Sequence, residues 1–263
     1  DQVYDIRSDD FEVSNSFTDY EPELNWMPRL AFSFPISDDA NFFAHYDVTY
    51  QRPLARNQVS PLTYFFLNDA SLGVNSPVSN ANLRPEKTTD FEVGFQQKIS
   101  QNSALRVSAL YREFKDQIQA RLYQFTDGFG PGTQYFGFDN IDVSTVKGLN
   151  FRYDLRRVKN IEMFMSYSLQ FADGTGSSET SALGIAAGGD NITEIFPLSF
   201  DERHQVNLSL DYRYGYGAKY NGPTIGGKDI FANTGVNLLV QAISGRPFTK
   251  QRVAAEFSGA GFS

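Results

Sequence analysis

Apolar and polar residues alternate along much of this sequence. The alternation is clearest in IEMFMSYSLQF at 161–171, where every second residue from Ile161 to Phe171 is apolar or aromatic. The residues between them are polar except Phe164. Side chains of one parity share one face of a β-strand. The segment is therefore predicted to be a strand with one apolar face and one mostly polar face.

The same period of two residues recurs in seven further segments. They are 29–36, 40–50, 90–99, 104–114, 149–155, 205–214 and 234–242. No window shows the 3.6-residue period of an amphipathic helix. The pattern predicts an all-β fold of eight antiparallel strands with almost no helix.

The connections between these strands fall into two length classes. Short connections are expected at 37–40, 100–103 and 156–160, with a longer one near 215–229. The intervening connections are long and rich in Gly, Asn, Ser, Pro and Asp, at 51–88, 119–146 and 172–202. Short turns at one end of a sheet and long loops at the other are typical of outer-membrane barrels.

The apolar faces of these strands meet either a protein core or lipid. A soluble β-sandwich with half-buried sheets also alternates, but several segments reach the about 9–11 residues that a transmembrane strand needs. Charged residues lie inside strands on the polar parity, where a wet lumen accommodates them. They are Arg106, Arg112, Arg152, Asp154, Asp211 and Arg213. We therefore predict an antiparallel transmembrane β-barrel, which must close because lipid satisfies no free strand edge.

Composition narrows the classes of function. The 263 residues carry a net charge of −8, which argues against nucleic-acid binding. Cysteine is absent and only His45 and His204 offer imidazole, so a thiolate nucleophile is excluded and a His-rich metal site is disfavoured. The N-terminus DQVYDIRSDDFEV has neither the basic nor the apolar region of a signal peptide. We expect both ends of the chain to be truncated and the strands to be a section of a larger barrel.

Several motifs, in their order along the chain, resemble TonB-dependent outer-membrane transporters. In NLRPEKTTDFEVG, the residues Asn82, Leu83, Pro85, Glu86, Glu92 and Gly94 match a pattern of that family. Further similar stretches are PRLAFSFPIS with YQRP, VKGLNFRYDL at Gly148, FDERH at Asp201, Arg203 and His204, and SGRPFT at 244–249. The resemblance covers most of residues 26–250.

The resemblance implies a plugged barrel of about 22 strands, with about eight of them in this chain. Residues 1–263 would be a partial outer-membrane β-barrel domain with no plug domain present. The implied function is import of a scarce nutrient (siderophore, cobalamin, glycan or peptide) across the outer membrane of a Gram-negative bacterium, without enzymatic activity or a cofactor. The implied partners are outer-membrane lipid, the nutrient ligand, the TonB complex through a missing N-terminal region, and a surface lipoprotein. Two alternatives are a surface β-protein that binds glycans through aromatic loops and a barrel-type lipid hydrolase.

The aromatic segment RLYQFTDGFGPGTQYFGF at 121–138 is the main candidate for ligand contact. Exposed aromatic rings among flexible glycines suit recognition of a sugar or cyclic ligand. The candidate residues are Phe125, Phe129, Tyr135, Phe136 and Phe138. The alternative is a long strand pair that projects beyond the membrane and packs on itself.

Other polar residues are expected to have structural roles. Glu92 is predicted to be a lumen charge paired with a neighbouring strand, and His45 to be a lumen histidine whose ring has hydrogen-bond partners. Asp201, with Arg203 and His204, is expected to anchor a long loop to its strand. Glu162 is placed in the lumen at the periplasmic rim, where Arg156 or Arg157 pairs with it. No Gly-x-Ser-x-Gly elbow or Ser–His spacing favours catalysis, and ADGTGSSET and GGDN lack the ligand spacing of a calcium loop.

Overall fold

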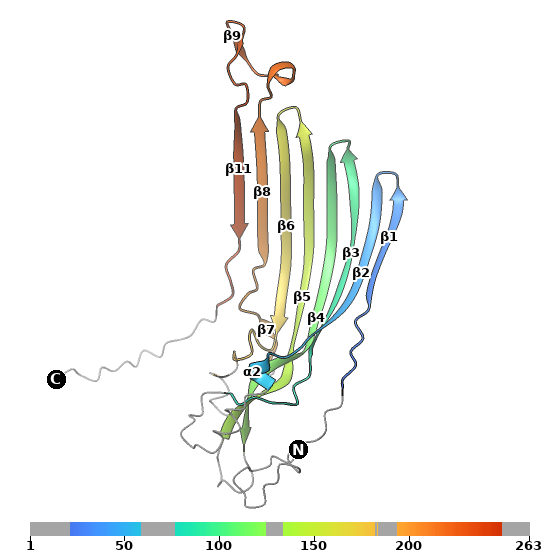
Figure 1. Cartoon of the computed structure of the whole chain (residues 1–263), viewed down its shortest axis with the longest axis vertical. Helices are drawn as coiled ribbons and strands as arrows, with labels where there is room; N and C mark the ends of the chain where they lie inside the picture. The colour runs from blue at the N-terminus through green and yellow to red at the C-terminus, as the bar shows by residue number, and fades with distance from the viewer. Residues whose placement is uncertain (1–21, 59–76, 125–133, 182, 184–193, 249–263) are drawn as a thin grey trace, which may run out of the picture.

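The computed structural model describes residues 22–58, 77–124, 134–181, 183 and 194–248 (Figure 1). Strands dominate the described residues, with one four-residue helix, α2 (Ala55–Gln58), and one 3-10 turn, η1 (Gly217–Lys219). The long strands are β1 (Arg29–Ser37), β2 (Ala40–Gln51), β3 (Glu86–Ser100), β4 (Ser103–Gln124), β5 (Gln134–Val158), β6 (Ile161–Gly174), β8 (His204–Arg213) and β11 (Gly235–Ile243). The remaining strands are short: β7 (Phe196–Pro197), β9 (Thr224–Ile225) and β10 (Lys228–Asp229).

The eight predicted strands are confirmed and form one curved antiparallel sheet. Its order is β1-β2-β3-β4-β5-β6-β8-β11, so each long strand pairs with its neighbour in sequence. The two-residue strand β7 pairs with β6, and β9 and β10 form a separate small hairpin. Strands β1 and β11 are the two edges of the sheet, and the sheet does not close on itself within the described residues (Figure 1).

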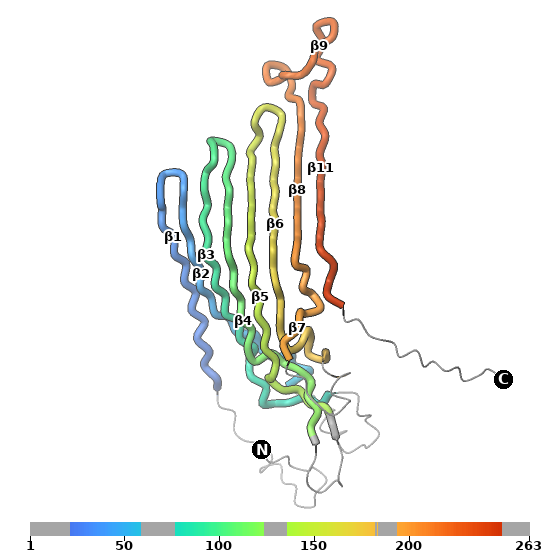
Figure 2. The backbone as a smooth tube through the Cα atoms, turned by 180° about the vertical axis from the view of Figure 1, so that it is seen from behind, coloured from blue at the N-terminus to red at the C-terminus, as the bar shows by residue number. Residues whose placement is uncertain are grey.

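The connections sort to the two ends of the sheet as predicted. Two-residue turns join β1 to β2, β3 to β4 and β5 to β6, and they lie at the same end of the sheet as the longer β8–β11 connection (Figure 2). The long connections gather at the opposite end, which we call the loop end (Figure 1). No helix among the described residues is long and apolar enough to cross a membrane.

One predicted connection was wrong in its extent. The segment 119–146 was expected to be a long loop, but β4 continues to Gln124 and β5 already begins at Gln134. The pairing shifts register between Phe114 and Gln117 and then runs on to the pair Gln124–Gln134. Beyond that shift, other parts of the chain cover the hairpin in place of lipid, so its residues need not alternate.

The two faces of the sheet differ as the alternation predicted. One face carries apolar side chains that no described part of the chain covers, among them Phe32, Val93, Leu149, Met165 and Leu238. The other face carries polar side chains that pair with one another, across strands or within a strand. We call these the lipid-facing face and the lumen face, because a barrel in a membrane exposes its apolar side to hydrocarbon.

Phe43 is, like Phe164, an aromatic side chain on the mostly polar lumen face. It is buried, and it lies opposite Gly94 in the β2–β3 register. The Arg106 guanidinium lies 4.2 Å from the centre of its ring, a cation–π contact. The missing side chain at Gly94 leaves the space that the Phe43 ring fills.

Candidate functional site

Ion pairs join neighbouring strands across the lumen face. Arg106 Nη2 lies 3.6 Å from Glu92 Oε1, and His45 Nδ1 lies 3.8 Å from Glu92 Oε2. Glu92 thus pairs with the strands on both sides, as predicted for a lumen charge. Lys98, in contrast, pairs with Asp39 at 3.1 Å.

Further ion pairs lie along the same lumen face. Arg112 pairs with Asp90 across β3 and β4, and Arg152 Nε lies 2.8 Å from Asp154 Oδ2 within β5. Because each of these guanidinium groups has a carboxylate partner, the inner face is polar without leaving these arginines unpaired.

A second group of charges lies at the turn end of the lumen face. Arg157 Nη2 lies 2.9 Å from Glu162 Oε2, which confirms the predicted pairing of Glu162. The same guanidinium also pairs with Asp211, which in turn lies 3.4 Å from Arg213. Arg157, near the end of β5, therefore joins this strand to both β6 and β8.

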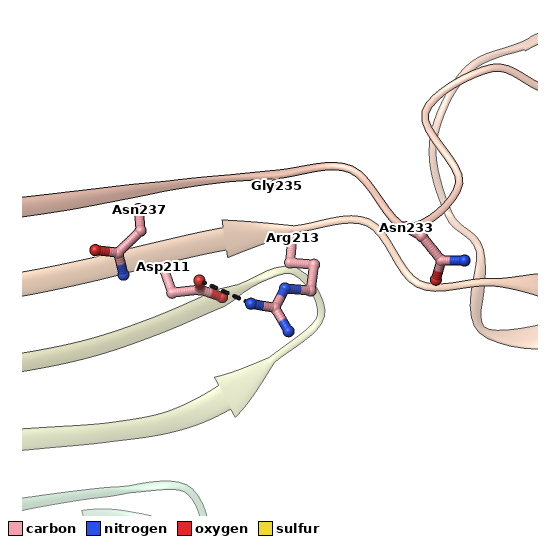
Figure 3. Close-up of a pocket in the computed structure, with 5 residues that line it drawn as sticks. All are labelled: Asp211, Arg213, Asn233, Gly235 and Asn237. Carbon is pink, nitrogen blue, oxygen red and sulfur yellow. Dashed lines mark hydrogen bonds and ion pairs between the residues drawn. The ribbon is translucent and has the colours of Figure 1, made fainter.

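A pocket of about 470 Å³ lies beside this group (Figure 3). Its lining is polar and comes from β8, β11 and the end of the connection between them. The lining residues are Asp211, Arg213, Asn233, Gly235 and Asn237. The pocket is open to solvent, and its polar lining is what a water-filled lumen requires.

At the loop end, the NLRPE motif clamps the long β4–β5 hairpin. Arg84 Nη2 lies 2.8 Å from Asp116 Oδ1, at the register shift where Asp116 adopts a φ of 56°. The Asn140 side chain accepts from the Arg84 backbone N–H at 2.8 Å and donates to the Asp116 carbonyl at 2.7 Å. Glu86 Oε1 accepts from the Ile118 N–H at 2.8 Å. The motif thus supplies the hydrogen bonds that the irregular backbone needs.

An apolar cluster fixes the same hairpin from the side. Leu83 of the motif packs with Ile118, Ala120 and Phe138, all of which are buried, and Leu183 packs against them. The asparagine at position 80 reinforces the contact, since its Nδ2 donates to the Phe138 carbonyl at 3.0 Å. The segment 77–85 is therefore part of the hairpin's support.

The predicted ligand-contact aromatics divide into two groups. Phe136 and Phe138 are only 4% and 8% exposed, so the expectation that they present open rings was wrong. Phe138 packs in the apolar cluster with Leu83, and the burial of both rings matches the alternative of a strand pair packing on itself. Phe125 and Phe129, and the side chain of Tyr135, lie outside the described residues. A ligand role for these three stays a prediction.

A buried polar cluster binds the segment after β6 to the hairpin. Gln119 Nε2 lies 2.9 Å from Asp142 Oδ2 and 2.8 Å from Ser181 Oγ. Thr175 Oγ1 donates to Asp142 Oδ1 at 2.9 Å. Burial raises the pKa of Asp142, and the hydrogen bonds from Gln119 and Thr175 offset part of that rise. Gly176 lies against this carboxylate, so there is no room for a side chain there.

The same region holds a small pocket of about 160 Å³. Its lining mixes carboxylates, hydroxyls and apolar groups. The lining residues are Glu86, Gln117, Ile118, Asp142, Gly176, Ser177, Ser178, Glu179, Leu198 and Phe200. Within the described part of the chain, no group of three or more His, Cys, Asp or Glu side chains is placed to hold a metal ion. The Asp and Asn of GGDN fall outside that part.

The FDERH stretch anchors the long connection that enters β8. Asp201 is 2% exposed, accepts from the Ala172 N–H at 3.0 Å and pairs with Arg203 at 3.1 Å. These contacts fit the predicted anchoring role. His204, on the lipid-facing parity, has its Nδ1 atom 2.9 Å from the Tyr167 hydroxyl. Each of these two polar groups therefore has a partner on the lipid-facing surface.

Together, the long antiparallel strands, the apolar outer face, the paired charges of the lumen and the sorted connections define an outer-membrane type of β-barrel sheet. The family model described as "TonB dependent receptor-like, beta-barrel" matches residues 2–245, so the chain belongs to this family. Its location is accordingly the outer membrane of a Gram-negative bacterium. No curated protein sequence matches this chain.

One solved structure with a TM-score above 0.5 supports the fold, and two others are reported beside it as similar. The outer membrane transporter YddB from Escherichia coli is 16% identical, with a TM-score of 0.52, over 83% of this chain and 33% of that chain. The siderophore receptor PirA from Acinetobacter baumannii is 14% identical, with a TM-score of 0.49, over 83% of this chain and 34% of that chain. The alcaligin receptor FauA from Bordetella pertussis is 15% identical, with a TM-score of 0.45, over 76% of this chain and 28% of that chain. The chain thus spans about a third of the length of these proteins or less.

Proposed function

We propose that this chain is the barrel section of a receptor that imports a scarce nutrient across the outer membrane with energy from the TonB complex. The observation that carries the proposal is the family match over residues 2–245. The family and its similar structures are receptors and transporters, which agrees with the expectation that the chain is not an enzyme. The glycan-binding surface protein and the lipid hydrolase are not favoured by this match.

Two features of the sheet support a transport role. The lumen face is lined by paired charges, such as Glu92 with Arg106, with the polar His45 side chain beside them, and a polar wall suits passage of a polar solute. At the loop end, the hairpin, the motif at Leu83 and the segment around Ser181 are tied together by hydrogen bonds and apolar contacts. A rigid support of this kind holds neighbouring loops in place for recognition.

We propose residues 125–133, with Phe125, Phe129 and the neighbouring Tyr135, as the part of this hairpin that meets the nutrient. A siderophore, cobalamin, a glycan and a peptide are the ligand classes under test. A plug domain, TonB contact through it, and a surface lipoprotein partner belong to the full-length receptor and remain proposals as well.

Uptake by cells that express the full-length protein tests this function. Accumulation of a ferric siderophore, cyanocobalamin, an oligosaccharide and an oligopeptide is measured in paired strains with and without functional TonB. We expect TonB-dependent accumulation of one ligand class, and its loss when residues 125–133 are replaced by a Gly-Ser linker of equal length. Heat-modifiable gel migration confirms that the variant barrel is folded. If none of the four ligand classes accumulates more in the strain with functional TonB than in the strain without it, the proposal is contradicted.

A further inference from the structure

The connection between β8 and β11 is unlike the other connections at its end of the sheet. The others are two-residue turns, whereas this connection spans residues 214–234 and contains η1 and the β9–β10 hairpin (Figure 1). We call it the aromatic turn. Its β9–β10 hairpin turns at Gly226 and Gly227, which adopt φ values of 60° and 75°, as a tight hairpin turn requires.

A cluster of rings holds the aromatic turn together. The rings of Tyr214 and Phe231 stack with their centres 5.7 Å apart, and Tyr220 lies 5.9 Å from Tyr214. Tyr212, the last ring on the lipid-facing parity of β8, meets Tyr214 edge to face at 5.3 Å. Tyr220 donates from its hydroxyl to the Pro223 carbonyl at 2.6 Å. The cluster therefore continues the aromatic surface of the barrel wall.

The strand parity shows on which side of the barrel wall this cluster lies. The β8–β11 ladder runs on past Arg213, since the Tyr214 N–H donates to the Thr234 carbonyl at 2.9 Å. Tyr214 has the same parity as Tyr212, and Tyr212 lies opposite Val236 on the lipid-facing face. Tyr220 and Phe231, the rings of the turn that pack on Tyr214, thus lie on the lipid-facing side, and the β9–β10 hairpin continues beyond the end of the sheet (Figure 2). The polar pocket of Figure 3, with Asp211 and Asn237, lies on the other parity.

The outer surface of the aromatic turn is apolar and carries two lysines. Tyr216 and Ile225 are 72% and 68% exposed, and Ile230 and Phe231 are also exposed. Lys219 and Lys228 are exposed, and neither forms an ion pair with a described residue. With Asp229, the turn has a net charge of +1, whereas the whole chain has −8. Exposed rings and aliphatic groups beside lysines match the chemistry of a lipid interface.

We propose that the aromatic turn is a membrane anchor that lies in the phospholipid headgroups at the turn end of the barrel. Turns of such barrels face the periplasm, so the leaflet is the inner one. Tyr216, Ile225 and Ile230 enter the headgroup layer, and Lys219 and Lys228 bind lipid phosphates. A soluble periplasmic protein is the competing occupant. The anchor depends on the barrel's place in the membrane and does not depend on what the receptor transports.

Spin labels on the full-length protein test the anchor. Single cysteines for nitroxide labelling are placed in a cysteine-free background by Ile225→Cys, by Asp38→Cys in the β1–β2 turn, and by Met165→Cys on the lipid-facing face of β6. The protein is reconstituted in vesicles of phosphatidylethanolamine and phosphatidylglycerol. Collision rates with oxygen and with a water-soluble nickel complex are then measured.

We expect the label at Ile225 to be several-fold less accessible to nickel than the label at Asp38, and to approach the Met165 label in its oxygen collisions. In the Lys219→Gln/Lys228→Gln background, or with phosphatidylcholine in place of phosphatidylglycerol, this protection should fall at least twofold. If the label at Ile225 is as accessible to nickel as the label at Asp38, the membrane-anchor proposal is overturned, and a soluble periplasmic protein becomes the remaining occupant. Protection that does not respond to either change overturns the role of the lysines. Both outcomes can occur in a receptor that still transports.

Discussion

The ring of Phe43 occupies the space directly over Gly94 on the lumen face. A Cβ atom built at residue 94 would lie 2.6 Å from Cζ of Phe43 and 2.5 Å from the Val107 carbonyl oxygen. Contacts this short are essentially never observed for a real Cβ, so any side chain at position 94 forces the β2–β3–β4 sheet to adjust. The glycine of the motif is thus needed for packing, independently of any ligand.

We expect Gly94→Ala to destabilise the barrel by about 1–3 kcal/mol, the usual cost of overpacking. The measurement is the temperature midpoint of heat-modifiable gel migration of the full-length protein. Gly245→Ala is the control, since a Cβ there meets no atom within 4 Å. Because the Val107 carbonyl also crowds this position, Gly94→Ala/Phe43→Ala should recover only part of the loss. Equal temperature midpoints for Gly94→Ala and Gly245→Ala would show that the Phe43 ring does not exclude a side chain at position 94.

Arg157 should matter more to stability than its partner Glu162. Arg157 pairs with both Glu162 and Asp211, so Arg157→Gln removes two ion pairs whereas Glu162→Gln removes one. Asp211 keeps Arg213 at 3.4 Å in either variant. Denaturant midpoints in detergent micelles should therefore rank wild type above Glu162→Gln, and Glu162→Gln above Arg157→Gln. If the denaturant midpoint of Arg157→Gln is instead higher than that of Glu162→Gln, Arg157 is not the shared partner of the two carboxylates.

The polar cluster at the loop end should loosen as the pH rises. The pKa of Asp142 is raised by burial, so the folded state binds the proton more tightly than the unfolded state does. The stabilising contribution of Asp142 is therefore complete below its unfolded value of 3.8 and falls as the pH rises through the higher folded pKa. Asp142 lies at the loop end, past the β5–β6 pair Ser144–Gly174.

Hydrogen exchange of the backbone at Gly176–Ser181 measures this dependence. In the wild type, the free energy of local opening should decrease with rising pH above 3.8. Asp142→Asn keeps the shape and much of the hydrogen bonding but cannot titrate, so its opening free energy should be flat over the same range. A parallel slope in both proteins would assign the pH dependence to another group.

Tyr167 and His204 should show strong coupling, since their hydrogen bond of 2.9 Å lies on the lipid-facing surface. Tyr167→Phe leaves the His204 Nδ1 atom without this partner, and we expect a loss of about 1–3 kcal/mol. Replacing both residues by Phe should restore most of the stability, because no polar group then lacks its partner. Tyr153→Phe is the matched control, since its hydroxyl has no partner among the described residues. If the loss of stability in the double variant, measured from denaturant midpoints, equals the sum of the losses in the two single variants, the two residues are not coupled.

The strands inside the membrane could be predicted from the sequence because lipid imposes a strict rule. Along β6, every residue from Ile161 to Phe171 either faces hydrocarbon or faces the wet lumen, and the sequence follows this alternation. The pairing of Glu162 with Arg157 was also within reach, because the turn 159–160 brings the two residues together.

The support at the loop end was not predictable in the same way. There, protein segments cover the hairpin in place of lipid, so Gln119 and Ile118 are both buried although one is polar and the other apolar. Phe136 and Phe138 looked like binding residues because a Gly-rich sequence suggests exposure. Phe138 is buried against Leu83, more than fifty residues away, and no local pattern reports that contact.

The long β4–β5 hairpin also has a consequence for substitutions at the loop end. Its pairing runs from Gln117–Asp142 to Gln124–Gln134, and eight residues at about 3.3 Å each extend roughly 25 Å along the strand. The ribbon therefore extends past the last pair that β4 makes with β3, at Lys115, and past the pair that β5 makes with β6 at Ser144. A substitution within this ribbon can therefore alter the loop end while leaving the strand pairs beside the lipid-facing apolar side chains unchanged.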